Sequence, residues 1–387
     1  MVEFEFWWLL IIPFFFFLGW IAARIDIKHI ISETTDLPAA YFKGLNHSIH
    51  GNIEEATVAF NEALNIKPDS LELHIIQGQL LRKLGKIDQS INLHTKILNS
   101  KELNNSQSES IKAELIQDYF AAGFYDRCQT LCNEIKEVKY KKFKLEVLLD
   151  IAIKQRNWNA AIKTSEEFEK EVGLSNNKAI AHFLCELAVE KINEKKEVQA
   201  IKYLEQSLKK DKDCCRANII LGEFEYNKKN YKNAIGIWKK IELQNPLYLS
   251  LVLNQLLECY KKINNENEGL SLLSRYKENY RLSNVDNVIY KFYLDSAGPK
   301  KAELIARENL IKEPSIKNLD QFYSAQVLDQ KKNKDVEIIQ QVIKNTIGNK
   351  YFHICEKCGF KTKQFHWQCA ACNSWDSMTV ESEEIKQ

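Results

Sequence analysis

The chain has almost no excess of charge of either sign. Its 387 residues include 54 Lys and Arg against 52 Asp and Glu, a formal net charge of +2. The C-terminal stretch from Lys350 to Gln387 holds five Lys and five acidic residues. It therefore lacks the basic patch of a nucleic-acid-binding module, and we expect no nucleic acid among the partners.

The chain also lacks the short motifs of common catalytic sites. It contains no P-loop, GxGxxG, GxSxG or HExxH motif. Five histidines are scattered through the middle of the chain without a cysteine or carboxylate at ligand spacing, so we expect them to be packed or solvated. They are His47, His50, His74, His94 and His182. The sequence thus offers no catalytic constellation, and the protein is not expected to be an enzyme.

Most of the ten cysteines show no pairing pattern. Six lie at scattered positions, as expected for small apolar packing residues in a compartment where thiols stay reduced. They are Cys128, Cys132, Cys185, Cys214, Cys215 and Cys259.

The other four cysteines form two CxxC pairs, Cys355 with Cys358 and Cys369 with Cys372, separated by ten residues. Each pair can form a tight turn with its sulfurs on one side, and Gly359 can take the positive φ that such a turn requires. This spacing predicts one tetrahedral metal ion with four thiolate ligands, for which zinc is favoured over iron. A closed shell of this kind serves as a structural or recognition site and leaves no position for a substrate.

The stretch around these cysteines is too small to fold on a hydrophobic core alone, yet too aromatic for a disordered tail. Its aromatic residues include Phe352, Phe360, Phe365, Trp367 and Trp375. A structural zinc contributes about 10–16 kcal/mol in folds of this size. His353 and His366 are alternative ligands, but the four cysteines already complete the shell. We expect the module to pack against the rest of the chain.

Near the N-terminus, residues 6–23 form a run of eighteen residues without a charge. A helix of this length spans about 27 Å, close to the thickness of a bilayer core. A cleaved signal peptide is disfavoured because Glu3 and Glu5 replace the usual basic flank. Arg24 and Lys28 follow the run, so the positive-inside rule places the body of the protein in the cytoplasm.

Small residues recur every 33 to 39 positions through the middle of the chain. The series is Ala56, Ser90, Cys128, Ala161, Ala200, Ala234, Gly269 and Ala302. Small side chains at this period are typical of the helix crossing in tetratricopeptide repeats. We expect the two longer gaps to contain inserted turns, near residues 104–108 and 173–177, and a further helical stretch at 316–347 to close the array.

These features predict an all-α protein, a right-handed tetratricopeptide solenoid with an N-terminal transmembrane helix and a C-terminal metal knuckle module. The expected parts are an anchor (1–24), a linker (25–36), an array of about eight to nine units (37–348), the metal module (349–378) and a tail (379–387). The groove of such an array binds protein segments, so docking is the expected activity.

The order of span, repeat array and CxxCG…CxxC knuckles resembles the bacterial lipopolysaccharide assembly protein B family over essentially the whole chain. Trp367 before Cys369 and Trp375 after Cys372 are similar to the family pattern, in which the module is rubredoxin-like. Further stretches that resemble the family are Gly19-Trp20, Tyr41 to Asn46, Gln117 to Tyr119, Ala121 to Gly123, Ala181 to Phe183, Cys185 to Ala188 and Cys358 to Phe360. One departure is Ala370, where the family usually has proline, which implies a looser second turn.

The resemblance implies an adaptor in the inner membrane of a Gram-negative bacterium. Family members present the lipid A deacetylase, UDP-3-O-acyl-N-acetylglucosamine deacetylase, to a membrane-anchored AAA+ protease, and are associated with the lipopolysaccharide export machinery. The sequence leaves open whether the chain also forms a homodimer. Two rivals are a rubredoxin-type redox protein with iron and a scaffold for another membrane assembly, such as cytochrome maturation.

Overall fold

A computed structural model describes residues 39–100, 103–329, 334–381 and 383–384, together with Phe17 and Trp20. The expected anchor and linker therefore lie outside the described residues, apart from Phe17 and Trp20. Among the described residues, no helix is both long enough and apolar enough to cross a membrane.

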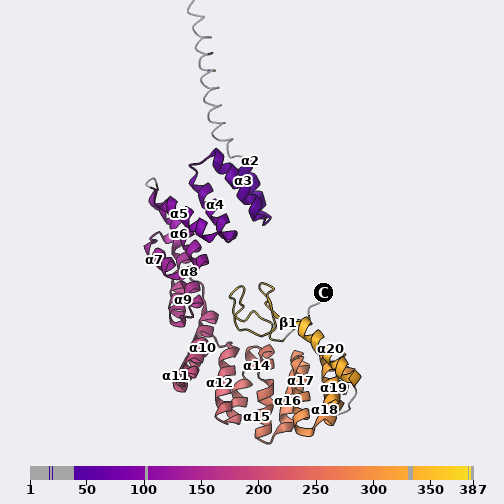
Figure 1. Ribbon diagram of the computed structural model, residues 1–387. Helices are drawn as coiled ribbons and strands as arrows, with labels where there is room; N and C mark the ends of the chain where they lie inside the picture. Colours follow the sequence, from indigo (N-terminus) through magenta and orange to yellow (C-terminus); the bar gives the residue numbers. More distant parts are fainter. Residues whose placement is uncertain are drawn as a thin grey trace, which may run out of the picture. The chain divides into compact units, whose positions relative to one another are not determined.

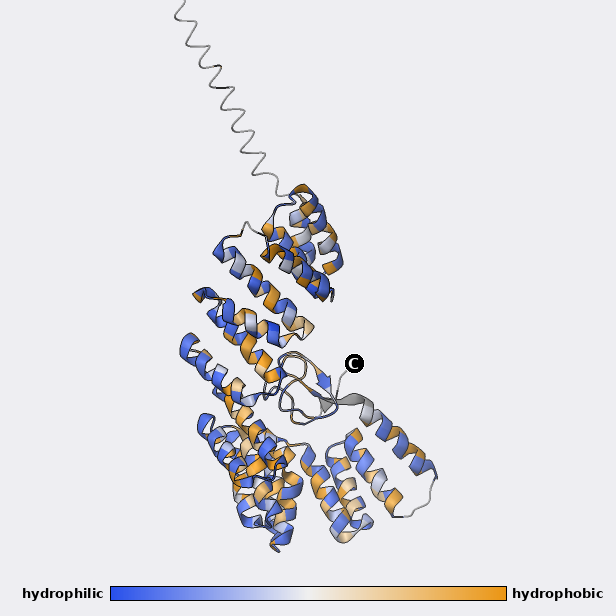
Figure 2. Ribbon diagram, turned by 60° about the vertical axis from the view of Figure 1, so that its left-hand side comes forward, coloured by the Kyte–Doolittle hydropathy of each residue, from blue (hydrophilic) through white to orange (hydrophobic). Residues whose placement is uncertain are grey.

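The chain divides into two compact units, residues 1–155 and 156–387 (Figure 1). The first contains α2 (Ala39–Ile49), α3 (Ile53–Ile66), α4 (Leu71–Lys83), α5 (Ile87–Leu98), α6 (Asn105–Ala122), α7 (Tyr125–Glu134), the 3₁₀ helix η1 (Val138–Tyr140) and α8 (Lys141–Lys154). Apolar and polar residues are interspersed along these helices (Figure 2).

The second unit continues the helical array and ends in a small sheet. Its helices are α9 (Trp158–Val172), α10 (Asn177–Asn193), α11 (Glu197–Lys210), α12 (Cys215–Asn227), α13 (Tyr231–Trp238), α14 (Ile241–Gln244), η2 (Pro246–Leu251), α15 (Leu253–Lys262), α16 (Glu266–Tyr280), α17 (Asn284–Ala297), α18 (Pro299–Lys312), α19 (Ile316–Leu328) and α20 (Lys334–Lys350). Its strands are β1 (Tyr351–Ile354), β2 (Lys361–Thr362) and β3 (Glu383–Glu384).

The repeat predicted from the small residues is present in the structure. Each of the eight is the fourth residue of its helix, in α3, α5, α7, α9, α11, α13, α16 and α18. All eight are buried. The helices approach closely because the first helix of a pair often carries a glycine. A Cβ added to Gly222 of α12 would lie 2.1 Å from Nε1 of Trp238 on α13, so this crossing has no room for a side chain.

The two longer gaps in the period come mainly from longer helices, although the connection from α5 to α6 is also two residues longer than the one from α3 to α4. Helices α6 and α10 have 18 and 17 residues, whereas α4 and α12 have 13 each. Residues 104–108 form no turn, because Asn104 and Gln107 make a capping box that begins α6. A turn does follow Gly173, but the connection from α9 to α10 is no longer than the one from α11 to α12.

At the C-terminal end, the stretch expected to be helical at 316–347 forms two helices, α19 and α20. The chain then enters a three-stranded antiparallel sheet of order β2-β1-β3. Strand β1 pairs with β2 through His353 and Thr362, and with β3 through Tyr351 and Glu384. Since β3 lies within residues 379–387, part of the expected tail belongs to the sheet. We call residues 351–381 and 383–384 the knot.

Candidate metal centre and its attachment to the repeats

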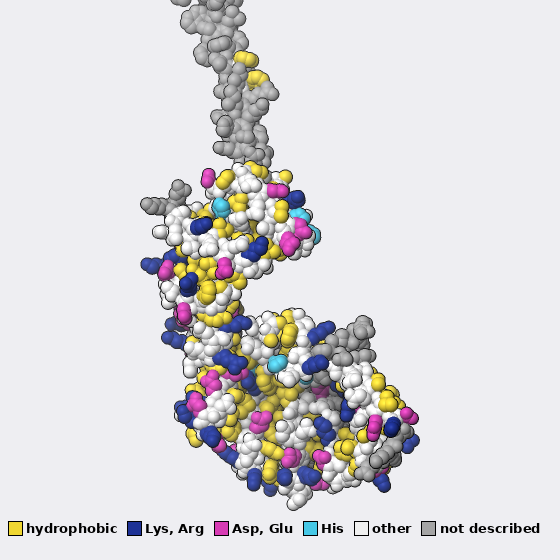
Figure 3. Space-filling model, viewed as in Figure 1, with side chains coloured by type: hydrophobic (Ala, Val, Ile, Leu, Met, Phe, Trp, Pro, Cys, Tyr) yellow, Lys and Arg dark blue, Asp and Glu magenta, His cyan; other side chains and the backbone are white. Residues whose placement is uncertain are grey.

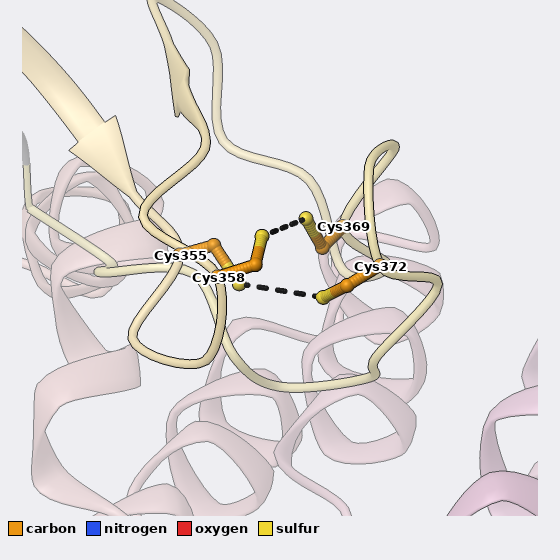
Figure 4. Close-up of side chains that lie close together, drawn as sticks. All are labelled: Cys355, Cys358, Cys369 and Cys372. Carbon is orange, nitrogen blue, oxygen red and sulfur yellow. Dashed lines mark hydrogen bonds between the residues drawn. The ribbon is translucent and has the colours of Figure 1, made fainter. Parts of the chain in front are cut away.

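The four cysteines of the CxxC pairs meet at one point in the knot (Figure 4). Their four sulfurs lie within 4.8 Å of one another. Sγ of Cys355 is 3.7 Å from Sγ of Cys372, and Sγ of Cys358 is 3.7 Å from Sγ of Cys369. These separations exceed a disulfide bond. Zinc–sulfur bonds of about 2.3 Å would place tetrahedral ligands about 3.8 Å apart, so the arrangement fits one metal ion.

The backbone explains why both pairs present their sulfurs on the same side. Gly359 has a φ of +74°, and its N–H donates to the carbonyl oxygen of Cys355 at 2.8 Å. Asn373 has a φ of +56°, and its N–H donates to the carbonyl oxygen of Cys369 at 2.9 Å. Asparagine is among the few residues that tolerate this left-handed region. The two knuckles are therefore built alike, and the expected role of Gly359 is confirmed.

Hydrogen bonds around the sulfurs favour the thiolate form of Cys355 and Cys372, whereas the surroundings of Cys358 disfavour its thiolate. Burial raises the pKa of Cys355, but the Ser377 hydroxyl and nearby backbone amides together lower it to about 6. Ser374 lowers the pKa of Cys372 through its hydroxyl and its backbone amide. For Cys358, the backbone amide of Phe360 lowers the pKa, but burial and the neighbouring sulfurs raise it to about 12. A bound cation would remove this repulsion between sulfurs.

The alternative histidine ligands do not join the cluster. Nδ1 of His353 lies 2.8 Å from the carbonyl oxygen of Thr379, and His366 is exposed. Among the described residues, the four cysteines are the one group of three or more side chains placed to hold a metal. The six scattered cysteines are all buried, which confirms their predicted packing role.

Contacts of two tryptophans, Trp367 and Trp375, join the knot to the repeats of its own unit. Trp367 stacks on Tyr248 of η2 with centroids 5.2 Å apart and planes 3° apart. Trp375 stacks on His182 of α10 at 4.7 Å and meets Phe183 edge-on at 5.9 Å. The knot therefore lies against the helical array (Figure 1), and the expectation that it packs there is confirmed.

A partly buried carboxylate strengthens this attachment. Oδ2 of Asp376 is 2.9 Å from Nε2 of His182 and 3.3 Å from Nζ of Lys178. The hydroxyl of Tyr248 donates to Oδ1 at 3.3 Å. Burial raises the pKa of Asp376, but His182 and Lys178 outweigh that effect and hold it below its usual value. Asp376 is thus a charged anchor of the knot on α10 and η2.

Two of the five scattered histidines contact carboxylates. The sequence did not predict these pairs, because the partners lie far apart along the chain. His182 and Asp376 are 194 positions apart, and His94 and Asp118 are 24 apart. Ser90 joins the second pair, but it donates to Asp118 instead of contacting the imidazole. All three side chains are 0% exposed. They form a buried structural network, since no substrate could reach the serine.

Comparisons with known proteins agree with this geometry. Residues 353–379 match a family model described as a rubredoxin metal binding domain. Lipopolysaccharide assembly protein B of Escherichia coli strain K12 is 24% identical over 374 residues, which cover 95% of this chain and 96% of that protein. The chain is similar to lipopolysaccharide assembly protein B along nearly its whole length. The protein of the same name from Haemophilus influenzae strain Rd is 23% identical over 382 residues, with the same coverage.

Among solved structures, Naa15/Naa10 bound to HypK-THB has a TM-score of 0.47 at 15% identity. That match covers 83% of this chain and 48% of the other. These values are too low to transfer any property of that complex.

The knot has a second polar anchor just beyond the region of the rubredoxin match. The carboxylate of Glu381 accepts hydrogen bonds from the backbone N–H groups of Ser283 and Asn284, at 2.9 and 3.0 Å. It also accepts from the hydroxyls of Ser250 and Ser283, both at 2.7 Å. A negative charge at the start of α17 suits the helix dipole. The preceding residue, Val380, is buried in the core of the repeats, so the C-terminal part of the knot is held by polar and apolar contacts together.

Proposed function

We propose that the chain is a non-catalytic adaptor in lipopolysaccharide assembly. The observation that carries this proposal is the match to proteins of that name over 95% of the chain and 96% of their length. The helical repeats supply a docking surface, and a structural site of four thiolates leaves no position for chemistry on a substrate. On the face shown in Figure 3, positive and negative side chains are interspersed.

In the finer form of this proposal, the chain presents the lipid A deacetylase to a membrane-anchored AAA+ protease and thereby limits lipid A synthesis. It also works together with the lipopolysaccharide export machinery. An adaptor of this kind acts through effective concentration, because holding client and protease on one surface raises their encounter rate without any new chemistry.

The proposal includes an anchor and a location. Residues 6–23 would hold the chain in the inner membrane, with the repeats on the cytoplasmic side. A reporter fused after Gln387 should be active only if it is of a cytoplasmic type. Activity of a periplasmic reporter at that position would contradict the orientation, and release of the protein by a high-salt wash would contradict the anchor.

The proposal also assigns Cys355, Cys358, Cys369 and Cys372 as ligands of one zinc ion. Zinc would supply a redox-silent crosslink that orders the knot. Metal analysis of protein purified from membranes should give one zinc per chain. Iron with a thiolate-to-iron absorption band would instead support a rubredoxin-type electron carrier.

The same purification tests the adaptor role. The deacetylase and the protease should be retained by the full chain, and depletion of the chain should lengthen the lifetime of the deacetylase. Retention of cytochrome maturation proteins in their place would assign the chain to that assembly instead.

A further inference from the structure

A cavity of about 400 Å³ lies in the second unit, where the last repeats meet the knot. Its walls come from η2, the start of α17, α19, the end of α20, β1 and residues 380–381. Its size falls within the usual range for ligand pockets. Because His353 and Val380 line it together with α17 and α19, the cavity exists only while the knot is attached to the repeats.

One wall of the cavity carries buried hydrogen-bond acceptors without a donor. Gln321 of α19 is 7% exposed and lines the cavity, and its Oε1 has no hydrogen-bond partner among the described residues. Oδ1 of the neighbouring Asp320 is also buried without a partner there. Leaving such groups unpaired destabilises a protein, so each calls for an explanation. A ligand that brings N–H donors would provide one.

The charge of the lining argues against a phosphate or nucleotide ligand. Lys317 is the one lysine or arginine among the described lining residues, and it is accompanied by the carboxylates of Asp320 and Glu381. The Glu381 carboxylate is already occupied by four hydrogen bonds from α17 and η2. Among the described lining residues there is no Phe, Tyr or Trp for stacking on a base or a sugar. The described residues also place no cluster of metal ligands here.

The remaining walls suit a polypeptide. Leu251, Ile347 and Val380 provide apolar surface beside the acceptors. Asn287 lies half-buried in the lining and donates one amide hydrogen to Oδ1 of Asn284, which leaves a second hydrogen for a carbonyl oxygen. A peptide backbone offers an N–H and a carbonyl at every residue, with side chains for the apolar wall.

We propose that this cavity binds an extended peptide segment of a client protein. Once the Gln321 and Asp320 side chains turn their buried oxygens toward the cavity, these oxygens accept hydrogen bonds from backbone N–H groups of the segment, and one side chain of the segment lies against Leu251, Ile347 and Val380. That the segment comes from the deacetylase rests on the proposed function above.

The test compares two identical substitutions. Gln321→Leu removes the acceptor in the cavity, and Gln255→Leu removes another buried unpartnered acceptor, on α15, which does not line the cavity. A random peptide library displayed on phage is selected on the full, metal-loaded chain in detergent. The affinity of the enriched peptides is then measured by fluorescence anisotropy.

We expect Gln321→Leu to weaken peptide binding about tenfold or more without lowering the Tm, since it removes an unpaired buried group. Gln255→Leu should leave binding within about twofold. Equal binding to both variants would overturn the proposal. So would the absence of any peptide enriched above detergent-coated beads.

Retention of the purified deacetylase separates this inference from the proposed function. Loss of retention in Gln321→Leu alone supports both. Retention that is unchanged in Gln321→Leu rejects the cavity as the client site while the adaptor role stands. If the unaltered chain does not retain the deacetylase, the proposed function fails, and the peptide selection alone decides whether the cavity binds peptides.

Discussion

Replacing Asp376 with alanine should weaken the attachment of the knot to the repeats without removing its metal. The side chain of Asp376 is 15% exposed, and that of its partner His182 is 1% exposed. A hydrogen bond to a charged group, here the Asp376 carboxylate, contributes about 1.5–3 kcal/mol, and the Tyr248 hydroxyl about 1 kcal/mol. Lys178 is 59% exposed, so its ion pair contributes only about 0–1 kcal/mol.

These contributions sum to about 2.5–5 kcal/mol, close to the usual cost of removing one partner of a buried pair. The ratio of attached to detached knot should therefore fall by a factor of roughly 100 to several thousand. Amide hydrogen exchange across residues 361–380 should accelerate accordingly, with metal content and helical circular dichroism unchanged. Asp213→Ala, at an exposed aspartate just before α12, is the control. Unchanged exchange in Asp376→Ala, or loss of the metal from it, would refute the anchoring role.

Three further predictions concern the metal, the first unit and the helix crossings. Cys358→Ser should release the metal and expose the aromatic residues of the knot while helix content stays nearly constant; metal that remains bound would contradict the assignment of ligands. Asp118→Ala removes a buried charge, which is 0% exposed, and should cost about 3–5 kcal/mol in urea unfolding of the first unit. Gly222→Ala should destabilise by about 1–3 kcal/mol because its Cβ meets Trp238. Gly236→Ala, with nothing within 4 Å of its Cβ, should instead stabilise by about 0.5–1 kcal/mol; the opposite order of thermal midpoints would refute the close-crossing argument.

The repeat architecture could be predicted because each unit buries its small residues through local contacts. Ala56 and Ala234 occupy the same position of their helices although they are far apart in the chain. The error at residues 104–108 has a local cause as well. Asn104 and Gln107 are polar residues typical of loops, but at this spacing they cap a helix.

The knuckles could also be predicted, since each contains its ligands and its turn residue within five positions. Asn373 directly follows the second pair, as Gly359 follows the first. The same positive-φ turn could therefore have been predicted there. The attachment of the knot could not be found in this way. No periodicity connects Asp376 with His182 or Glu381 with Ser283, because these contacts depend on how the whole second unit closes.

The position of the two polar anchors connects the metal to the proposed peptide cavity. Asp376 and Glu381 both follow the last cysteine of the knuckles, so the fold around the metal sets where their carboxylates reach the repeats. The knot is too small to keep that fold alone. Loss of the metal would therefore free the start of α17 from Glu381 and withdraw Val380 from the cavity wall. A peptide that binds only the complete cavity must then favour the metal-loaded chain, and by linkage the metal and the peptide must each tighten binding of the other by the same factor.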